Sequence, residues 1–356
     1  MGRFILFMLT MSLFNSCEFV EMDVYEISQF ESEMADSTTF TEVECRRRFY
    51  KAMEDKCSEY GIFGEIIEGP SGFGAGGEVE NEVLGHGMSK VPISGMCKIM
   101  AIALDYEKLS NVWSKNTYMI HTHGVIQDIL LKRSLDSHFG SVIEEDYSIL
   151  GWKTGSNGGL TNLMLASTCS ELEGSVMVAV MSRNYMPDTE ANNRSLAMKY
   201  LLDIGKALYL DREADISELR AAMLSQHVKN ALVVLCPPFP RKMYDWDILN
   251  DPYHFLFSYG GGDTLINPMS MIKVLVAEVV LDNVADVNKY VTITQNDIVA
   301  ATGGTGAIFT AGQKVTYMDL LCAMLMPSSN QAGYVLARRV GQLLLERENV
   351  RDVKRK

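Results

Sequence analysis

The chain has few of the features that would assign it to a membrane, a nucleic acid or a metal. The apolar stretch near its start covers only residues 4–14, whereas a helix needs about 20 apolar residues to span a bilayer. The formal charge is −13, and nucleic-acid binding requires clustered Lys and Arg. The 7 cysteines include no Cys-x-x-Cys pair, so neither a metal knuckle nor a disulfide framework is indicated.

Residues 1–42 are predicted to be an N-terminal segment rather than part of the domain. The stretch 4–14 follows Arg3 and suits the core of a signal peptide, and the acidic, Ser/Thr-rich residues after it form a loose lead-in. Cys17 stands where a lipoprotein cysteine could stand, although Phe14-Asn15-Ser16 is a poor lipobox. The alternative is a degraded junction left by a rearrangement of the gene.

The rest of the chain, an ordinary globular composition with 47% apolar residues, alternates helical and strand patterns. Apolar runs rich in Val and Met favour buried antiparallel strands. We predict strands at 147–155, 162–168, 174–182, 231–235 and 254–259, with short strands within 118–130. We predict helices at 45–60, 93–104, 192–210, 215–227, 270–281, 315–326 and 330–347, and a Gly-rich loop at 69–87.

Ser270 and Lys273 are three residues apart at the start of a predicted helix, so both side chains face the same side. An acyl-transfer enzyme needs a nucleophile with a base beside it. Lysine is a base only when neutral, and burial, a neighbouring cation or a helix N-terminus lowers its pKa. Pro268 suits the entry of the helix. Taken alone, Ser270 would be read as a helix N-cap.

Two further motifs extend this pattern. Ser328-Ser329-Asn330 stands between two predicted helices, unlike the other Ser-x-Asn copies at 114–116 and 182–184. Lys153-Thr154-Gly155 occurs once, at the end of a predicted strand, where a glycine lets another backbone approach closely. Alone, Lys153 would be a solvated strand end, and Ser328 with Asn330 a helix cap.

The three motifs and their surroundings resemble serine-type D-alanyl-D-alanine carboxypeptidases, the low-molecular-mass penicillin-binding proteins of the β-lactamase-like superfamily. The similar stretches are Asn267 to Lys273, Ala311 to Leu321 leading into Pro327 to Ala332, Phe49 to Met53, Pro70 to Phe73, and Gly151 to Gly155. They cover about residues 45–346, but in reversed order. The chain therefore resembles a circular permutant, with one domain at 43–356, in which 43–210 is equivalent to the family's C-terminal half and 230–356 to its N-terminal half.

The resemblance implies an α+β fold of three α/β/α layers, an antiparallel sheet flanked by helices. It implies Ser270 as the acylated nucleophile, Lys273 as its base, Ser328 as a proton relay and Asn330 as the residue that holds the substrate amide. It also implies binding of the terminal carboxylate by Lys153 and Thr154, close approach at Gly155, and an oxyanion hole formed by the backbone N–H groups of Ser270 and Ser156. The implied partners are peptidoglycan stem peptides ending in D-Ala-D-Ala and β-lactams, with no metal or cofactor. Such a substrate places the protein in the bacterial cell envelope, with peripheral membrane association left open.

Other readings compete with this one. A class A-like β-lactamase would carry a deacylating glutamate in a Glu-x-x-Leu-Asn loop and Ser-Asp-Asn in place of Ser328-Ser329-Asn330; neither is found. An inactive binding or scaffold protein, or a fusion of two half-domains, is the non-enzymatic alternative. His121 and His123 share a strand face and could bind a metal, but no third ligand is evident.

Overall fold

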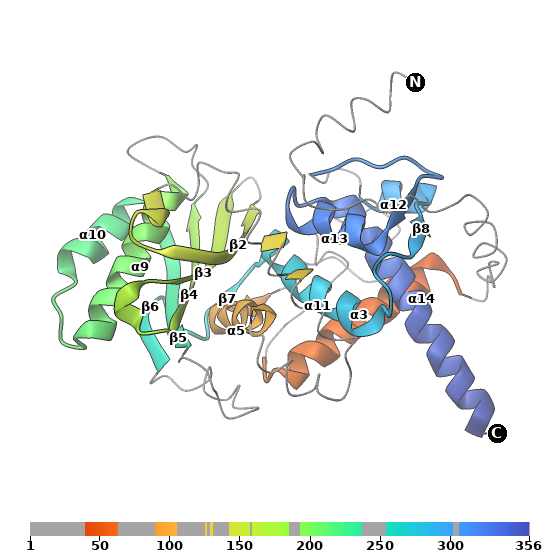
Figure 1. Ribbon diagram of the computed structural model, residues 1–356, viewed down its shortest axis with the longest axis horizontal. Coiled ribbons are helices and arrows are strands. Elements are labelled where there is room, and N and C mark those ends of the chain that lie inside the picture. The colour runs from red at the N-terminus through yellow and green to blue at the C-terminus, as the bar shows by residue number, and fades with distance from the viewer. Residues whose placement is uncertain are drawn as a thin grey trace, which may run out of the picture. The chain divides into compact units, whose positions relative to one another are not determined.

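A computed structural model describes residues 40–62, 90–104, 125–126, 129–130, 142–156, 159–184, 193–236, 254–301 and 306–355. Within the chain, Glu42–Lys356 form one compact unit (Figure 1). In the described ranges, no helix combines the length and apolar character needed to cross a membrane.

A five-stranded antiparallel sheet contains strands from both halves of the domain, the first block at 43–210 and the second block at 230–356. Its strands, in spatial order, are β2 (Ser148–Ser156), β3 (Leu160–Thr168), β4 (Val176–Asn184), β5 (Val228–Cys236) and β6 (Phe255–Tyr259). The pairing of β4 with β5 runs from Val176 opposite Cys236 to Arg183 opposite Val228. Strands from the first block therefore lie directly beside strands from the second.

Helices cover both faces of this sheet. The helices α9 (Arg194–Leu210) and α10 (Ser217–Ser225) lie on one side, and α5 (Ile93–Ala103) lies on the other (Figure 1). Successive residues of β3 point to alternate faces of the sheet, as strand geometry requires. Accordingly, Leu163 packs in the hydrophobic cluster with α9, and Met164 packs in the cluster with α5. Both faces are apolar since both are covered. The α+β prediction, an antiparallel sheet flanked by helices, is confirmed.

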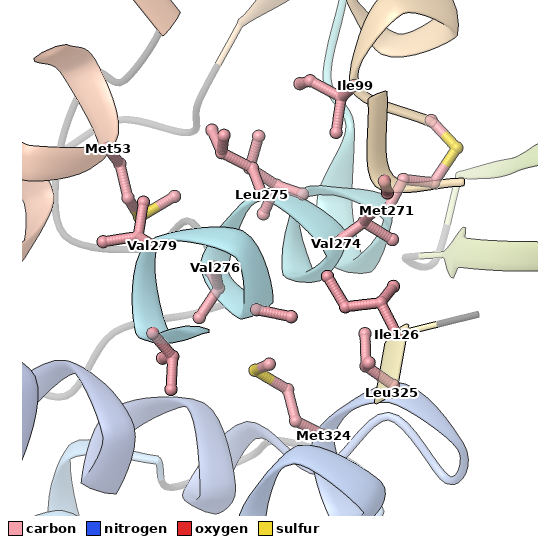
Figure 2. Close-up of a cluster of buried hydrophobic side chains, with 14 of the residues drawn as sticks. Met53, Ile99, Ile126, Met271, Val274, Leu275, Val276, Val279, Met324 and Leu325 are labelled. Carbon is pink, nitrogen blue, oxygen red and sulfur yellow. The ribbon is translucent and has the colours of Figure 1, made fainter. Parts of the chain in front are cut away.

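The helix α11 (Lys273–Asn283) is the centre of the larger cluster, and it follows the short 3₁₀ helix η4 (Met269–Ile272). Every residue from Lys273 to Leu281 is buried, as expected of a helix surrounded by other elements. Figure 2 shows its valines and leucine between Met53 of α3 (Glu42–Glu59), Ile99 of α5 and Met324 of α13 (Tyr317–Leu325).

The helices at the two ends of the compact unit pack on each other. α3 lies side by side with α14 (Asn330–Arg355), although they come from opposite ends of the described chain (Figure 1). At the crossing, Gly341 lies against the backbone carbonyl of Cys45, where a side chain would collide with main chain. Arg48 and Glu348 form an ion pair of 2.7 Å across the same helices.

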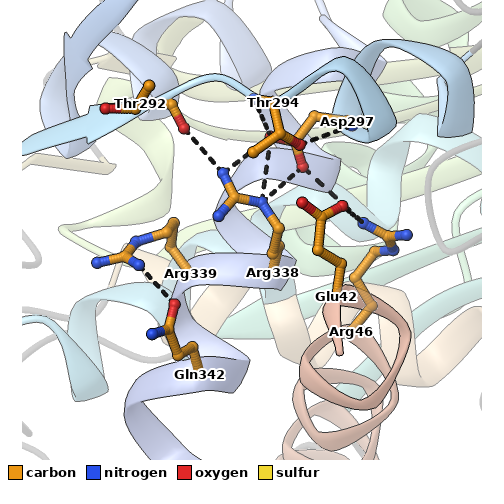
Figure 3. Close-up of polar contacts among 8 residues, drawn as sticks. All are labelled: Glu42, Arg46, Thr292, Thr294, Asp297, Arg338, Arg339 and Gln342. Atoms are coloured by element: carbon orange, nitrogen blue, oxygen red, sulfur yellow. Dashed lines mark hydrogen bonds and ion pairs between the residues drawn. The ribbon is translucent and has the colours of Figure 1, made fainter. Parts of the chain in front are cut away.

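A buried charge network also fastens this helix pair (Figure 3). Asp297, at the start of α12 (Gln295–Ala300), forms a capping box with Thr294 and is fully buried. Arg338 of α14 donates from Nε to Asp297 Oδ1 at 2.9 Å and from Nη2 to Oδ2 at 2.9 Å. Arg46 of α3 reaches the same carboxylate at 3.9 Å and Glu42 at 3.7 Å. One buried carboxylate thus serves two guanidinium groups from two helices.

Two short strand pairs and a 3₁₀ helix complete the elements of the described residues. β1 (Val91–Pro92) pairs with β7 (Leu265–Ile266), β8 (Tyr290–Thr292) pairs with β9 (Lys314–Thr316), and η1 (Ser170–Leu172) precedes β4. The helix predicted from 315 begins later, at Tyr317. Lys314–Thr316 forms β9, which pairs with β8, and Thr316 caps α13 through a capping box with Asp319. The short strands predicted within 118–130 were wrong for the described residues 125–126 and 129–130. These are helical, and their buried residues follow a helical spacing.

All six described cysteines are free thiols. Cys57 and Cys97 lie in the larger hydrophobic cluster. Burial raises the pKa of Cys45 to about 11 and that of Cys57 to about 12, so both remain protonated at neutral pH. Cys17 lies outside the described residues, as do residues 1–39 of the N-terminal segment, the Gly-rich loop, Pro70 to Phe73 and the two histidines 121 and 123.

Candidate active site

Ser270 and Lys273 come together at the junction of η4 and α11. Ser270 is the second residue of the 3₁₀ turn rather than the cap of an α-helix. Its side chain is half-buried, whereas Lys273 is fully buried. Lys273 Nζ donates to Ser270 Oγ at 3.1 Å. A nucleophile within hydrogen-bond distance of a lysine is the first element that acyl transfer needs.

The Lys273 side chain also contacts the loop before α14. Its Nζ lies 2.7 Å from the Ser328 carbonyl oxygen, 3.2 Å from Ser328 Oγ and 2.6 Å from Asn330 Oδ1, so these three oxygens and Ser270 Oγ share at most three N–H donors. Residues from the two predicted motifs, 55 and more positions apart, therefore meet at one nitrogen. The acceptors orient the lysine and fix its distance from Ser270.

Lys153 reaches the same hydroxyl from the other side. It is fully buried although it stands near the end of β2, so it is not a solvated strand end. Its Nζ donates to Ser328 Oγ at 2.9 Å and to the Thr154 carbonyl oxygen at 3.0 Å. Ser328 Oγ thus accepts from two lysines and retains its own proton as a donor. This arrangement suits a hydroxyl that passes a proton between neighbouring groups.

Gly155 brings strand β2 against the backbone of Ser270. A Cβ atom at this position would lie 2.6 Å from the Pro268 carbonyl oxygen and 2.7 Å from the Ser270 backbone nitrogen. Only a residue without a side chain permits this approach. Thr154 before it is half-buried, and Ser156 after it is exposed at the strand end. The strand end with the Lys-Thr-Gly motif therefore lies directly beside the serine.

The Ser328 loop is held by its neighbours. Ser328 has a φ of 65°, which few non-glycine residues adopt and which surrounding contacts must support. Ser329 caps α14, since its Oγ accepts from Ala332 N at 3.3 Å and donates to the Ala307 carbonyl oxygen at 2.7 Å. The helix cap is therefore Ser329, which leaves the Ser328 hydroxyl to the two lysines.

Sequence reasoning missed two buried polar groups, one beside the serine segment and one further along α11. Asn162 on β3 is fully buried and donates from Nδ2 to the Asn267 carbonyl oxygen, three residues before Ser270. Glu278 on α11 accepts from Tyr60 Oη at 2.5 Å, and burial together with this carboxylate raises the pKa of Tyr60 well above its usual value. Asn162 could have been noticed as a polar residue opposite Gly155 in the predicted hairpin.

The described residues contain no group of three His, Cys, Asp or Glu side chains placed to hold a metal ion. His121 and His123 lie outside them. The side chains that meet at Lys273 and Lys153 carry hydroxyl, amine and amide groups, the types that serine acyl transfer uses.

Comparison with known proteins finds a similarity for one segment of the chain. Residues 251–347 match the family model described as the Beta-lactamase enzyme family. The match includes the Ser270, Lys273, Ser328 and Asn330 positions, and Lys153 lies outside it. Neither a curated protein nor a solved structure matches the chain. This segment is thus similar to the beta-lactamase enzyme family, which supports a beta-lactamase- and penicillin-binding-like superfamily and a serine-hydrolase type of function.

Proposed function

We propose that the protein is a serine D,D-carboxypeptidase that removes the terminal D-Ala from peptidoglycan stem peptides and is acylated by β-lactams. The observation that carries the proposal is the meeting of Ser270, Ser328 and Asn330 at Lys273 Nζ, with Lys153 on the same Ser328 hydroxyl. Because stem peptides lie outside the cytoplasm, the proposal includes export to the bacterial cell envelope.

In the proposed reaction, Ser270 Oγ attacks the carbonyl carbon of the penultimate D-Ala while neutral Lys273 takes the hydroxyl proton. The backbone N–H groups of Ser270 and Ser156 stabilise the oxyanion. The C–N bond then breaks, and the leaving nitrogen receives a proton through Ser328, so D-Ala departs. Water hydrolyses the acyl ester and returns the proton to Ser270. The contacts of Lys273 with Ser270 and Ser328 support this path.

Substrate binding is assigned to the remaining residues. Lys153 and Thr154 bind the terminal carboxylate, and Asn330 holds the substrate amide. The substrate lies along β2 as an added strand, where Gly155 keeps the strand close to the serine. The burial of Lys153 supports a strong interaction with a carboxylate, since charge interactions strengthen where water is excluded.

The second candidate function is β-lactam hydrolysis, which the description of the matched family favours. Both reactions share the acylation step and differ in how the ester is hydrolysed. The sequence has no Glu-x-x-Leu-Asn motif, so the glutamate that activates water in class A enzymes has no counterpart by motif. We therefore rank the carboxypeptidase first and expect slow turnover of penicillin.

The deciding assay measures D-alanine release from a D-Ala-D-Ala peptide beside penicillin hydrolysis on one preparation. We expect D-alanine release with little penicillin hydrolysis, loss of the activity in Ser270→Ala, and no change in Ser258→Ala, a surface serine on β6. Rapid multiple-turnover penicillin hydrolysis would select the β-lactamase instead. Absence of both activities and of acylation would favour the inactive scaffold.

A further inference from the structure

Asn162 occupies the position in the sheet that faces the segment leading to the serine. In the β2–β3 pairing it is directly opposite Gly155, whose missing side chain makes room for the Pro268 carbonyl oxygen and the Ser270 nitrogen. Asn162 Nδ2 donates to the Asn267 carbonyl oxygen, across 105 residues of sequence. The segment 267–270 therefore meets the sheet at two adjacent points, one steric and one polar.

The backbone between these two points needs such support. Met269 has a φ of 49°, in the left-handed region that a side chain disfavours and that persists only where surrounding structure holds it. Asn267 Oδ1 accepts from Met269 N at 3.2 Å, and the Pro268 carbonyl oxygen accepts from Met271 N at 3.0 Å. Holding the Asn267 carbonyl thus fixes the start of the turn that presents Ser270.

Because Asn162 is buried, loss of its amide hydrogen bond should be costly. The side chain is fully buried, and its Oδ1 has no hydrogen-bond partner among the described residues. A buried polar group contributes by the hydrogen bond it makes and is costly when that bond is lost. An apolar residue of equal size would fill the space and leave the Asn267 carbonyl oxygen without this donor.

We propose that Asn162 is a positioning residue for the nucleophile, acting through the Asn267 carbonyl rather than on the substrate. This inference rests on the proposed acylation of Ser270. Its role is to hold the turn at Met269 and Ser270 in place while the substrate lies along β2.

The test compares Asn162→Leu with Asn162→Asp as the pH changes. Burial raises the pKa of a carboxyl group. Below that pKa the protonated carboxyl of Asn162→Asp can donate to the Asn267 oxygen, and above it the carboxylate repels the same oxygen. The rate constant for acylation by a fluorescent penicillin, divided by the wild-type value at each pH, should therefore rise as pH falls for Asn162→Asp. For Asn162→Leu the ratio should stay low, roughly 10- to 100-fold below wild type, at every pH.

Asn230→Asp is the matched control. Asn230 lies in the same cross-sheet row, reached from Asn162 through Ser182, but two strands further from the serine. Its ratio should stay near one and show no pH dependence. A pH-independent ratio for Asn162→Asp, or wild-type acylation of Asn162→Leu, would overturn the inference.

Crystal structures of the wild type and of Asn162→Leu separate this inference from the proposed function. If wild type is not acylated, the proposed function fails, and the position of Ser270 still decides the role of Asn162. We expect the 267–270 turn to move away from Gly155 in Asn162→Leu. An unmoved turn would contradict the positioning role, whatever the activity of the protein.

Discussion

Gly155 and Ser270 are in backbone contact although 115 residues separate them, since a Cβ atom at Gly155 would lie 2.7 Å from the Ser270 nitrogen. This contact joins the last strand motif of the resembling family to its first helix motif. Lys153-Thr154-Gly155 precedes the Ser270 motif in this sequence, and the contact shows how these two motifs meet in space.

Replacing Gly155 with alanine should displace the nucleophile. The added methyl group would meet backbone atoms, which cannot move aside as a flexible side chain can. We expect Gly155→Ala to lower the rate constant for acylation by at least about ten-fold and stability by about 1–3 kcal/mol. The measurements are penicillin labelling kinetics and urea unfolding.

Gly151→Ala is the control for this strand. Its Cβ would lie 3.1 Å from the Leu130 side chain and 3.5 Å from that of Leu104. The nearer of these atoms is the Leu130 Cβ, and neither atom belongs to the serine turn, so we expect labelling close to that of wild type even if stability falls. Equal losses in Gly151→Ala and Gly155→Ala would contradict a specific contact between Gly155 and the serine turn.

Loss of the Lys153 ammonium group should reduce acylation by both ligand classes. Lys153 donates to Ser328 Oγ and is buried beside the site. We expect Lys153→Ala to lower acylation by penicillin and D-alanine release by about ten- to a thousand-fold, as for one preorganised electrostatic contact. Lys314→Ala, at an exposed lysine on β9, is the control. Unchanged acylation in Lys153→Ala would contradict a role for Lys153 in acylation.

The Asp297 network should contribute stability rather than activity. Asp297→Ala removes the buried carboxylate that Arg338 and Arg46 share. We expect the free energy of unfolding to fall by about 3–5 kcal/mol, as for a broken buried ion pair. Asp319→Ala removes a similar capping box at α13 without the buried arginines, and should cost about 0.5–2 kcal/mol. Urea unfolding of both variants measures the difference. Equal losses would show that the arginines add nothing beyond the cap.

The apolar runs rich in Val and Met were enough to predict the strands of the sheet, and the spacing of Ser270 and Lys273 predicted that they share a face. The partners of buried polar groups could not be predicted, because Asp297 with Arg338 and Asn162 with Asn267 meet only through tertiary packing. The position of Ser328 between two predicted helices distinguished it from the other Ser-x-Asn copies. The sequence did not predict that Ser329 caps the helix, because this depends on its hydrogen bond with Ala332 N.

The reversed order of blocks predicts that the chain tolerates being rearranged. A variant running from residue 217 to 349, through a flexible linker, and on from 42 to 210 restores the order of the resembling family. Gly341 contacts Cys45, and residue 349 lies about 12 Å further along α14. A Gly/Ser linker of about 15 residues reaches about 20 Å. The new ends open between α9 and α10.

We expect the rearranged protein to fold and to bind penicillin covalently as the parent chain does, measured by circular dichroism and fluorescent penicillin labelling. A control with the same linker inserted between 210 and 217 of the parent order tests the effect of the linker alone. Failure of the rearranged chain to fold, with a folded control, would contradict the circular permutation.

The most direct test of the central claim is to locate the covalent adduct. The protein is treated with a fluorescent penicillin, digested, and its labelled peptide is identified by mass spectrometry. We predict one adduct, on the peptide that contains Ser270, and none in Ser270→Ala. An adduct on another residue, or none on a folded protein, would contradict the assignment of Ser270 as the nucleophile.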